Sequence, residues 1–281
     1  MDCLKKESEK GFVKRLKERL DVLLVDRKLV DSRQKAKTSI MAGLVFVDNQ
    51  RVDKAGTKVS KDADIFVKQN PNPYVGRGGL KLQKSVEEFH LQLTNTICCD
   101  MGASTGGFTD CMLQHGAKKV YAIDVGYNQL DYRLRVDSRV VSMEKTNIRY
   151  LDPQCITDPI DFISIDVSFI SLSLILPVAE KLITPSGQIV CLVKPQFEAG
   201  REQVGKNGIV RDEDVHRQVI QKVISFGLEL NLYPQALTYS PVTGAKGNVE
   251  YLLLLGRKQH NFSVEDSVKR AVAASHKELD K

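Results

Sequence analysis

The sequence predicts two domains: a small α+β domain at residues 1–68, a linker at 69–75 and an open α/β sheet domain at 76–281. From residue 96 onward, short apolar runs alternate with longer helical segments, a pattern typical of an open α/β sheet. Before residue 68, two helical segments precede short strand-like runs. Between them, Gln69-Asn70-Pro71-Asn72-Pro73 opposes both helix and strand and therefore marks the boundary.

Length and composition bound the class of protein. A chain of 281 residues, 42% hydrophobic and 27% charged, is globular, which excludes a disordered or collagen-like protein. The six cysteines form no C-x-x-C pair and no Cys/His metal spacing, residues 1–10 lack the apolar core of a signal peptide, and the uncharged stretch 167–179 is too short to span a bilayer. We expect reduced thiols, a cytoplasmic location, no metal and no membrane association.

The net charge of +6 is confined to the first quarter of the chain. Residues 1–70 hold 17 Lys+Arg and 11 Asp+Glu, whereas the remaining residues hold 24 of each. A short basic region on a neutral body favours a polyanionic partner, most simply nucleic acid. A solvated, lysine-rich surface accounts for the charge equally well.

The first domain reads as helices followed by a hairpin. Apolar residues at helical spacing predict a helix over 14–26. Ser32 is the expected N-cap of a second helix, whose apolar face consists of Ala36, Ile40 and Met41 and which stops at Gly43. Strands are expected at 44–47, from 52 and at 65–67, with a turn at 48–50.

Cations on the second helix suggest a phosphate-binding face. Arg33 and Lys37 lie one turn apart with Lys35 beside them. The region resembles the small RNA-binding domain of ribosomal small-subunit protein four, also found in pseudouridine synthases and tyrosyl-tRNA synthetases. The matching residues are Arg19-Leu20-Asp21, Leu24, Ser32-Arg33, Ala36, Ile40, Gly43, Val45, Val47, Val52 and Asp64-x-x-Val67. The resemblance implies RNA binding by Arg19, Arg33, Lys35 and Lys37; a helix–hairpin domain with another partner is the alternative.

In the second domain the expected elements alternate along the chain. Strands are expected at 97–99, 120–123, 140–141, 162–165, 189–193 and 249–255, and helices at 107–115, 172–182 and 212–226.

The loop after the first of these strands predicts a cofactor site. It enters with Asp100 and contains three glycines in the spacing G-x-x-x-G-G, which is neither the dinucleotide G-x-G-x-x-G pattern nor a phosphate-binding P-loop. Glycines let a backbone approach a ligand closely, and an entering carboxylate suits a cofactor that carries a cation. Asp124, which ends the second strand, is placed to accept hydrogen bonds from ribose hydroxyls.

An adenosine with a cationic amino-acid portion is S-adenosylmethionine, which we therefore expect as cofactor. A nucleotide, or a purely structural glycine turn, remains the alternative. The expected cofactor-binding residues are Asp100, Gly102, Ala103, Ser104, Thr105, Gly106, Gly107, Phe108 and Asp124.

Four charged residues adjoin strand ends or glycine-rich segments. Asp166 and Lys194 end strands, Glu250 starts the last strand, and Lys81 follows the linker. Side chains that end neighbouring parallel strands meet at one edge of the sheet. Each residue taken alone is also compatible with a solvated strand-end charge or an ion pair.

The chain as a whole resembles the TlyA (hemolysin A) family, which joins the small RNA-binding domain to a Rossmann-like methyltransferase domain similar to the FtsJ-type 2′-O-methyltransferases. The stretches that carry the resemblance are Arg77-Gly78-Gly79-x-Lys81-Leu82, Gly102-Ala103-Ser104-Thr105-Gly106-Gly107-Phe108-Thr109, Asp124-Val125-Gly126-Tyr127-x-Gln129-Leu130, Asp166-x-Ser168-Phe169-Ile170-Ser171-Leu172, Val193-Lys194-Pro195-Gln196-Phe197-Glu198 and Gly247-Asn248-Val249-Glu250-Tyr251.

The resemblance implies a catalytic Lys-Asp-Lys-Glu set of Lys81, Asp166, Lys194 and Glu250, and places Asn147 at the adenine pocket. It implies 2′-O-methylation of cytidine in 16S ribosomal RNA, 23S ribosomal RNA or both, with ribosomal RNA or ribosomal subunits as partners. Members of the family with a longer N-terminal helix and C-terminal tail are associated with both targets, and the resemblance therefore favours both for this chain, which has a lysine-rich start before residue 19 and a tail at 257–281.

Lys194 is the candidate base for the ribose hydroxyl. A free lysine has a pKa of about 10.4, so burial and neighbouring positive charge must lower it. Asp166 would orient this lysine, and Lys81 and Glu250 would complete the network. The alternatives are methylation of another RNA, a cytolysin (as the hemolysin name suggests) and a catalytically silent RNA-binding regulator. The oligomeric state does not follow from the sequence.

Overall fold

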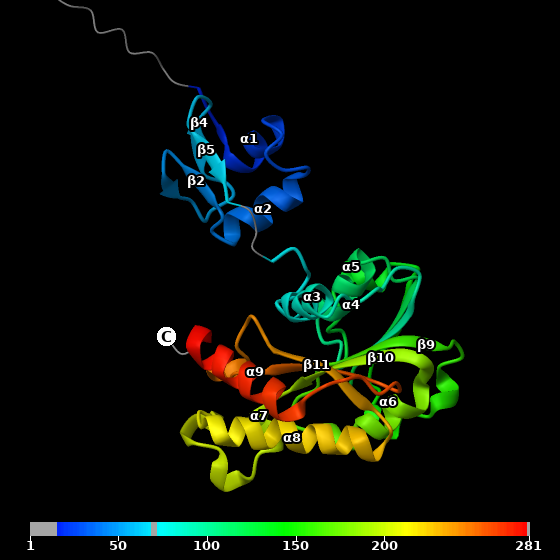
Figure 1. Cartoon of the computed structure of the whole chain (residues 1–281). Helices are drawn as coiled ribbons and strands as arrows, with labels where there is room; N and C mark the ends of the chain where they lie inside the picture. Colours follow the sequence, from blue (N-terminus) through cyan, green and yellow to red (C-terminus); the bar gives the residue numbers. More distant parts are fainter. Residues whose placement is uncertain (1–15, 69–71, 280–281) are drawn as a thin grey trace, which may run out of the picture. The chain divides into compact units, whose positions relative to one another are not determined.

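The computed structural model describes residues 16–68 and 72–279, which fall into two compact units, Met1–Pro71 and Asn72–Lys281 (Figure 1). Residues 1–15 of the lysine-rich start and residues 69–71 of the expected linker lie outside the described residues. Each unit has its own apolar core.

In the first unit, two helices and a three-stranded antiparallel sheet enclose one core that includes Leu20, Leu24, Ile40 and Val45 (Figure 1). The helices are α1 (Leu20–Asp26) and α2 (Arg33–Met41). The sheet has the order β3-β2-β5, and β1 pairs separately with β4. The strands are β1 (Lys17–Arg19), β2 (Val45–Val47), β3 (Gln50–Arg51), β4 (Lys58–Ser60) and β5 (Ile65–Val67).

The ends of α2 agree with the prediction, but one of its expected core residues does not. The Ser32 hydroxyl accepts a hydrogen bond from the Lys35 N–H at 3.2 Å, and Gly43 follows the helix with φ +70°, a conformation that glycine adopts without strain. The placement of Met41 in the apolar face was wrong, because Ala36 and Ile40 face the core and Met41 is 65% exposed.

The helix expected over 14–26 begins later than predicted. Lys17–Arg19 instead forms β1, which pairs antiparallel with β4, and the chain turns into α1 at Leu20. Backbone pairing with a distant strand therefore overrides the local helical periodicity here.

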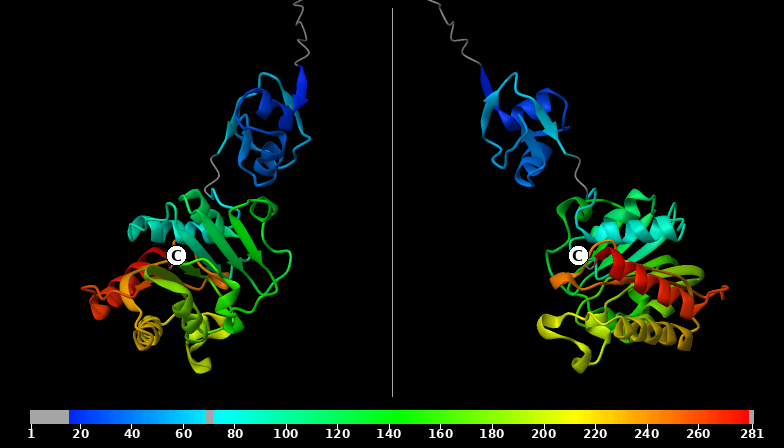
Figure 2. Two further views of the ribbon diagram at one scale, coloured as in Figure 1. Left: turned by 90° about the vertical axis from the view of Figure 1, so that its right-hand side faces the viewer. Right: turned by 60° about the vertical axis from the view of Figure 1, so that its left-hand side comes forward.

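The second unit is a seven-stranded sheet in the order β11-β12-β10-β9-β6-β7-β8, with helices on both faces (Figures 1 and 2). The pairs among β6 to β10 are parallel, whereas β12 is antiparallel to both β10 and β11. The strands are β6 (Ile97–Met101), β7 (Lys119–Ile123), β8 (Val140–Met143), β9 (Ile160–Ile165), β10 (Ile183–Val193), β11 (Tyr233–Tyr239) and β12 (Tyr251–Gly256).

Two apolar clusters lie on the two faces of this sheet. One joins strand residues to α3 and α4 and includes Leu82 and Phe108; the other joins them to α6, α8 and α9 and includes Ile220 and Val272. The helices are α3 (Gly78–Glu88), α4 (Gly107–Gln114), α5 (Tyr132–Arg135), α6 (Leu176–Leu182), α7 (Pro195–Glu198), α8 (Glu213–Glu229) and α9 (Val264–Leu279), with short 3₁₀ turns at Ile148–Tyr150, Pro153–Cys155, Leu172–Leu174, Arg201–Gln203, Lys206–Gly208 and Ala245–Gly247.

The strand order reverses between β6 and β9, the point at which open α/β sheets bind ligands at the carboxyl ends of their strands. The loops that follow these two strands touch there. A side chain at Gly102, where φ is +91°, would place Cβ 2.5 Å from the Asp166 carbonyl oxygen. Glycine is therefore required at this position both for its backbone conformation and for its lack of a side chain.

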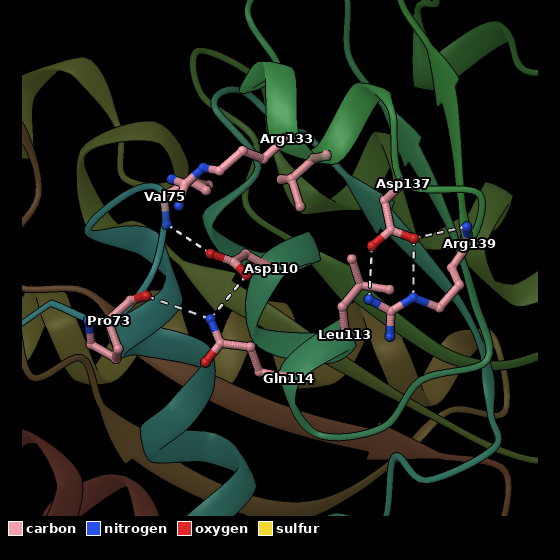
Figure 3. Close-up of a pocket in the computed structure, with 9 residues that line it drawn as sticks. Pro73, Val75, Asp110, Leu113, Gln114, Arg133, Asp137 and Arg139 are labelled. Atoms are coloured by element: carbon pink, nitrogen blue, oxygen red, sulfur yellow. Dashed lines mark hydrogen bonds and ion pairs between the residues drawn. The ribbon is translucent and has the colours of Figure 1, made fainter. Parts of the chain in front are cut away.

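Two backbones also approach closely where α3 meets α4. A Cβ at Gly107 would lie 2.8 Å from the Gly79 amide nitrogen, so the first turns of the two helices pack with no side chain between them. The segment before α3 is fixed to α4 as well: the Val75 N–H donates to Asp110 at 2.8 Å, and the Gln114 amide bridges Asp110 and the Pro73 carbonyl (Figure 3). A pocket of about 270 Å³ lies here, and no predicted site residue lines it.

We predict that Gly107→Ala destabilises the protein by about 1–3 kcal/mol, because its Cβ would clash with backbone atoms that have no room to move. The melting temperature should fall by several degrees in a thermal unfolding scan. Gly78→Ala is the matched control, since its Cβ would meet only the Phe108 ring at an ordinary 3.4 Å. Equal melting temperatures for the two variants would contradict the close approach.

Candidate active site

Four elements bring the predicted catalytic residues to one edge of the sheet. Lys81 projects from α3, Asp166 follows β9, Lys194 follows β10, and Glu250 precedes β12. Because β12 is antiparallel to β10 and Tyr251 pairs with Val193, the residue before β12 lies beside the residue after β10. Glu250 thus joins the carboxyl-end edge even though it stands at the start of its strand.

The four side chains form a continuous chain of ion pairs. Lys81 Nζ lies 2.7 Å from Glu250 Oε2 and 3.4 Å from Asp166 Oδ2. Asp166 Oδ1 in turn lies 2.6 Å from Lys194 Nζ, which also donates to the Ser168 hydroxyl at 3.1 Å. The structure therefore brings all four predicted residues together.

This cluster is largely buried and has no net formal charge. The side chains of Glu250, Lys194 and Lys81 are 3%, 7% and 11% exposed, and that of Asp166 is 20% exposed. Burial by itself would lower the pKa of Lys81, but the carboxylates of Asp166 and Glu250 outweigh it, and the pKa is raised. Burial would likewise raise the pKa of Asp166, but the two lysines hold it below its usual value.

Neighbouring groups that the sequence did not single out hold this cluster in place. Ser168 is the hydroxyl partner of Lys194. Glu198 is buried, and it accepts hydrogen bonds from the Ser171 hydroxyl and the Leu172 N–H, both at 2.7 Å. It therefore ties the loop after β10 to the loop after β9. Both residues lie within the motifs of the family resemblance, but nothing in the spacing assigns either of them a contact.

The sequence predicts that the Asp100 carboxylate meets a cationic cofactor, but in the structure this carboxylate points into the protein interior. Asp100 is fully buried within β6, and its oxygens accept hydrogen bonds from the hydroxyls of Thr109 at 2.6 Å and Ser164 at 2.9 Å. Burial raises its pKa to about 6, although both hydroxyls act in the opposite direction. Asp100 joins β6 to β9 and α4 beneath the glycine loop.

The remaining residues of the glycine loop fall into buried and accessible groups. Ala103, Gly106, Gly107 and Phe108 are buried, and Phe108 packs in the core against α3. Ser104 and Thr105 are exposed, and Gly102 is half-buried. The accessible part of the loop is therefore its tip, at the carboxyl end of β6.

Asp124 faces this tip from the end of β7. Its two oxygens accept hydrogen bonds from the Ser104 N–H at 2.8 Å and the Gly126 N–H at 2.7 Å, and its side chain is half-buried. The Asp124 carbonyl accepts from the Thr146 N–H, which places the exposed Asn147 in the adjoining loop. Each Asp124 oxygen retains a lone pair with which to accept a ligand hydroxyl.

In the first unit, a buried carboxylate organises two of the predicted RNA-binding residues. Asp21 is fully buried, and it pairs with Arg19 at 2.9 Å and Arg33 at 3.0 Å. Hydrogen bonds from Arg19, and then those from Arg33, lower the pKa of Asp21 to about 2 despite its burial. The two arginine side chains remain 45% and 58% exposed.

The two predicted lysines on α2 are placed less favourably for phosphate. Lys35 forms an exposed ion pair with Asp31 at 2.8 Å, which offsets its charge, and Lys37 is half-buried. Arg19 and Arg33 share one carboxylate and keep a net positive charge, whereas the charge of Lys35 is matched by Asp31.

Within the described residues, no group of three or more His, Cys, Asp or Glu side chains is arranged to hold a metal ion. Over the same ranges, no helix combines the length and apolarity needed to cross a membrane. Cys98, Cys99, Cys111 and Cys191 are buried free thiols, and burial raises the pKa of Cys98 and Cys111 to about 12, which disfavours the reactive thiolate.

The switch-point loop, the carboxylate at the end of β7 and the buried lysine–carboxylate cluster define an enzyme of the α/β methyltransferase class. Comparison with known proteins agrees with this class. The FtsJ-like methyltransferase family matches residues 74–257, and the S4 domain matches residues 18–65.

The chain belongs to the TlyA (hemolysin A) family of FtsJ-like methyltransferases. It is 52% identical to the putative rRNA methyltransferase YqxC of Bacillus subtilis over 94% of this chain and 95% of that protein. It is 40% identical to the 16S/23S rRNA (cytidine-2′-O)-methyltransferase TlyA of Mycobacterium tuberculosis over 91% of this chain and 97% of that protein. A solved structure of a putative hemolysin from Streptococcus thermophilus is 47% identical, with a TM-score of 0.74 over 95% of this chain and 98% of that chain.

The raised pKa of Asp100 leads to a prediction about stability. Its folded-state pKa of about 6 lies above its ordinary value of 3.8, so the folded protein keeps the proton longer than the unfolded chain does. Stability relative to Asp100→Asn should therefore fall as pH rises from about 4 to 7, by about 3 kcal/mol at about 1.4 kcal/mol per pKa unit.

Urea unfolding of both proteins at several pH values measures this difference. Well below pH 3.8, both states of the wild-type protein carry the proton, so any remaining difference between the two proteins comes from contacts other than this ionisation. A difference that stays constant up to pH 7 would show that Asp100 titrates normally.

Proposed function

We propose that this protein transfers a methyl group from S-adenosylmethionine to the 2′-hydroxyl of cytidine in 16S ribosomal RNA, 23S ribosomal RNA or both. The observation that carries the proposal is the continuous contact from Glu250 through Lys81 and Asp166 to Lys194 at the switch-point edge. The B. subtilis and M. tuberculosis relatives, both named as rRNA methyltransferases, supply the substrate class. A cytoplasmic location accompanies ribosomal RNA as substrate.

Several groups at the tip of the glycine loop fit the cofactor. Gly102 keeps the loop free of a side chain where it meets the loop after β9, and the lone pairs of Asp124 suit ribose hydroxyls. Asn147, in the adjoining loop, is our candidate for the adenine contact. When bound, S-adenosylmethionine supplies a methyl carbon on a sulfonium leaving group.

The chain's own residues would activate and orient the ribose. Lys194 Nζ would accept the proton of the 2′-hydroxyl as that oxygen takes up the methyl group. For this step Lys194 must be the neutral amine, its own proton having passed to solvent, and the Asp166 oxygen 2.6 Å from Lys194 Nζ would hold that nitrogen in place. Lys81 and Glu250 fix Asp166 from the opposite side, so positioning supplies part of the acceleration.

RNA binding and methyl transfer are assigned to different units. We propose that residues 1–68 form an RNA-binding domain and residues 76–281 the methyltransferase domain, joined by a linker at 69–75. Arg19 and Arg33, held by Asp21, have N–H groups left over to meet phosphate oxygens.

Lys194→Arg tests the proposed base directly. An arginine keeps the positive charge beside Asp166 but does not lose its proton, so methyl transfer should fall by about 10²- to 10⁴-fold while the fold is retained. The measurement is mass mapping of 2′-O-methyl groups on both ribosomal RNAs from cells that lack the gene and are complemented with either form, together with turnover of the purified proteins.

Cofactor binding is the control, because Lys194 lies outside the loop assigned to the cofactor. Calorimetric titration with S-adenosylhomocysteine should give similar affinities for the Lys194→Arg variant and the wild type. Near-normal methyl transfer by the variant would refute the base assignment. Absence of gene-dependent methylation on either ribosomal RNA would refute the substrate, and red-cell lysis that persists in Lys194→Arg would instead support a lytic protein.

Arg33→Ala should weaken RNA binding across sequences and lower the slope of log affinity against log salt by about one. Asp21 would still be paired with Arg19 through two hydrogen bonds, so the domain should stay folded. Fluorescence anisotropy with a ribosomal RNA fragment at several salt concentrations measures both effects. Lys269→Ala removes an equal charge from the exposed surface of α9 and should change neither, and equal slopes for both variants would contradict the role of Arg33.

A further inference from the structure

The outer face of the β3-β2-β5 sheet carries a row of side chains that the proposed catalytic and phosphate contacts do not use. Phe46 on β2 lies directly opposite Phe66 on one side and Arg51 on the other. Their neighbours Val45, Val47 and Ile65 are buried beneath the sheet, so the row points away from the helices. Phe66 is 60% exposed and Phe46 is half-buried.

The side chain of Arg51 extends from this row to Gly43. A Cβ at Gly43 would come within 2.2 Å of the guanidinium carbon of Arg51, so the guanidinium lies against the Gly43 backbone, two residues before β2. Glycine at this position thus makes room for a planar cation as well as ending α2. The two phenylalanines, paired across β2 and β5, are thus flanked by a guanidinium on the side of Gly43.

The charges around the row are divided between its two sides, along the direction of the strands. Exposed Lys68, two residues after Phe66, lies on the side to which the Arg51 guanidinium reaches toward Gly43. Exposed Asp48 and Asp64 lie on the other side, where the Asp64 N–H donates to the Asp48 carboxylate at 3.0 Å. A ligand with a flat apolar body and an anionic backbone on one side matches this distribution.

We propose that this row, Arg51–Phe46–Phe66, is a stacking platform for unpaired bases of RNA, with the phosphate backbone passing on the side of Arg51 and Lys68. Aromatic side chains beside cations bind single strands because every base offers a stacking face. The platform lies on the face of the sheet away from α2, which carries Arg33, so it would contact a second segment of the RNA. The inference rests on the proposed RNA substrate.

Phe66→Ala tests the platform in the full-length protein. Its affinity for a short fluorescein-labelled single-stranded RNA should fall by about five- to a hundred-fold, the range that loss of one base–aromatic stack produces. Its affinity for the same strand within a duplex should be unchanged, because paired bases offer no free face. Phe66→Tyr should bind both probes as the wild type does.

Met41→Ala is the matched control, since Met41 is a similarly exposed apolar side chain of the same domain on α2. Unchanged single-strand binding by Phe66→Ala, or equal losses for both probes, would overturn the platform. The proposed reaction is tested separately by methylation mapping. If methylation depends on the gene but Phe66→Ala leaves single-strand affinity unchanged, this inference alone is wrong. If Phe66→Ala lowers single-strand affinity but no methylation depends on the gene, the proposed reaction alone is wrong.

Discussion

The second unit depends on a buried network of charges in which no member is stable alone. An unpaired lysine or carboxylate in a low-dielectric interior costs several kcal/mol, so Lys81, Asp166, Lys194 and Glu250 are tolerated only as a set. Each is delivered by a different element, namely α3, the loop after β9, the loop after β10 and the residue before β12. The relative positions of these four elements are therefore coupled. An antiparallel β12 is part of that requirement, because a parallel strand would carry Glu250 to the opposite edge of the sheet.

Lys81 shows how backbone packing controls the chemistry. It comes from a helix, so its reach depends on where α3 lies on the sheet. The contact between Gly79 and Gly107 sets that distance, and the hydrogen bond from Val75 to Asp110 sets where the helix begins. Asp100, on β6 beneath the glycine loop, links this strand to β9 and α4 by accepting hydrogen bonds from two hydroxyls. Residues outside the charged cluster, such as Gly79 and Gly107, therefore control the distance between Lys81 and Asp166.

Prediction from sequence succeeded where a local pattern had a single physical cause, and it failed where distant contacts decided the outcome. Apolar runs identified β6 to β10, because parallel strands that are buried on both faces consist mostly of apolar residues. The antiparallel edge strand β11 was missed, since it carries Pro234 and a register shift and is only partly buried. Helix α3 was missed because its two leading glycines have low helix propensity. Packing against α4 stabilises the helix in the folded protein. The charged cluster was anticipated from strand ends and family motifs, but the inward turn of Asp100 depends on the hydroxyls of Thr109 and Ser164, which no spacing reveals.

Both units use the same device, a carboxylate placed between two cations, and the degree of burial decides what each can do. Asp21 holds Arg19 and Arg33 at the surface, where both guanidiniums stay about half exposed and keep donors available for phosphate. Asp166 holds Lys81 and Lys194 beneath the surface, where both ammonium groups are nearly closed to water. In the first arrangement, exposure leaves the guanidinium donors in contact with water, which is what the proposed binding of a polyanion requires. In the second, exclusion of water strengthens the interaction of each charge with its neighbour, which is what the proposed positioning of the reacting groups requires.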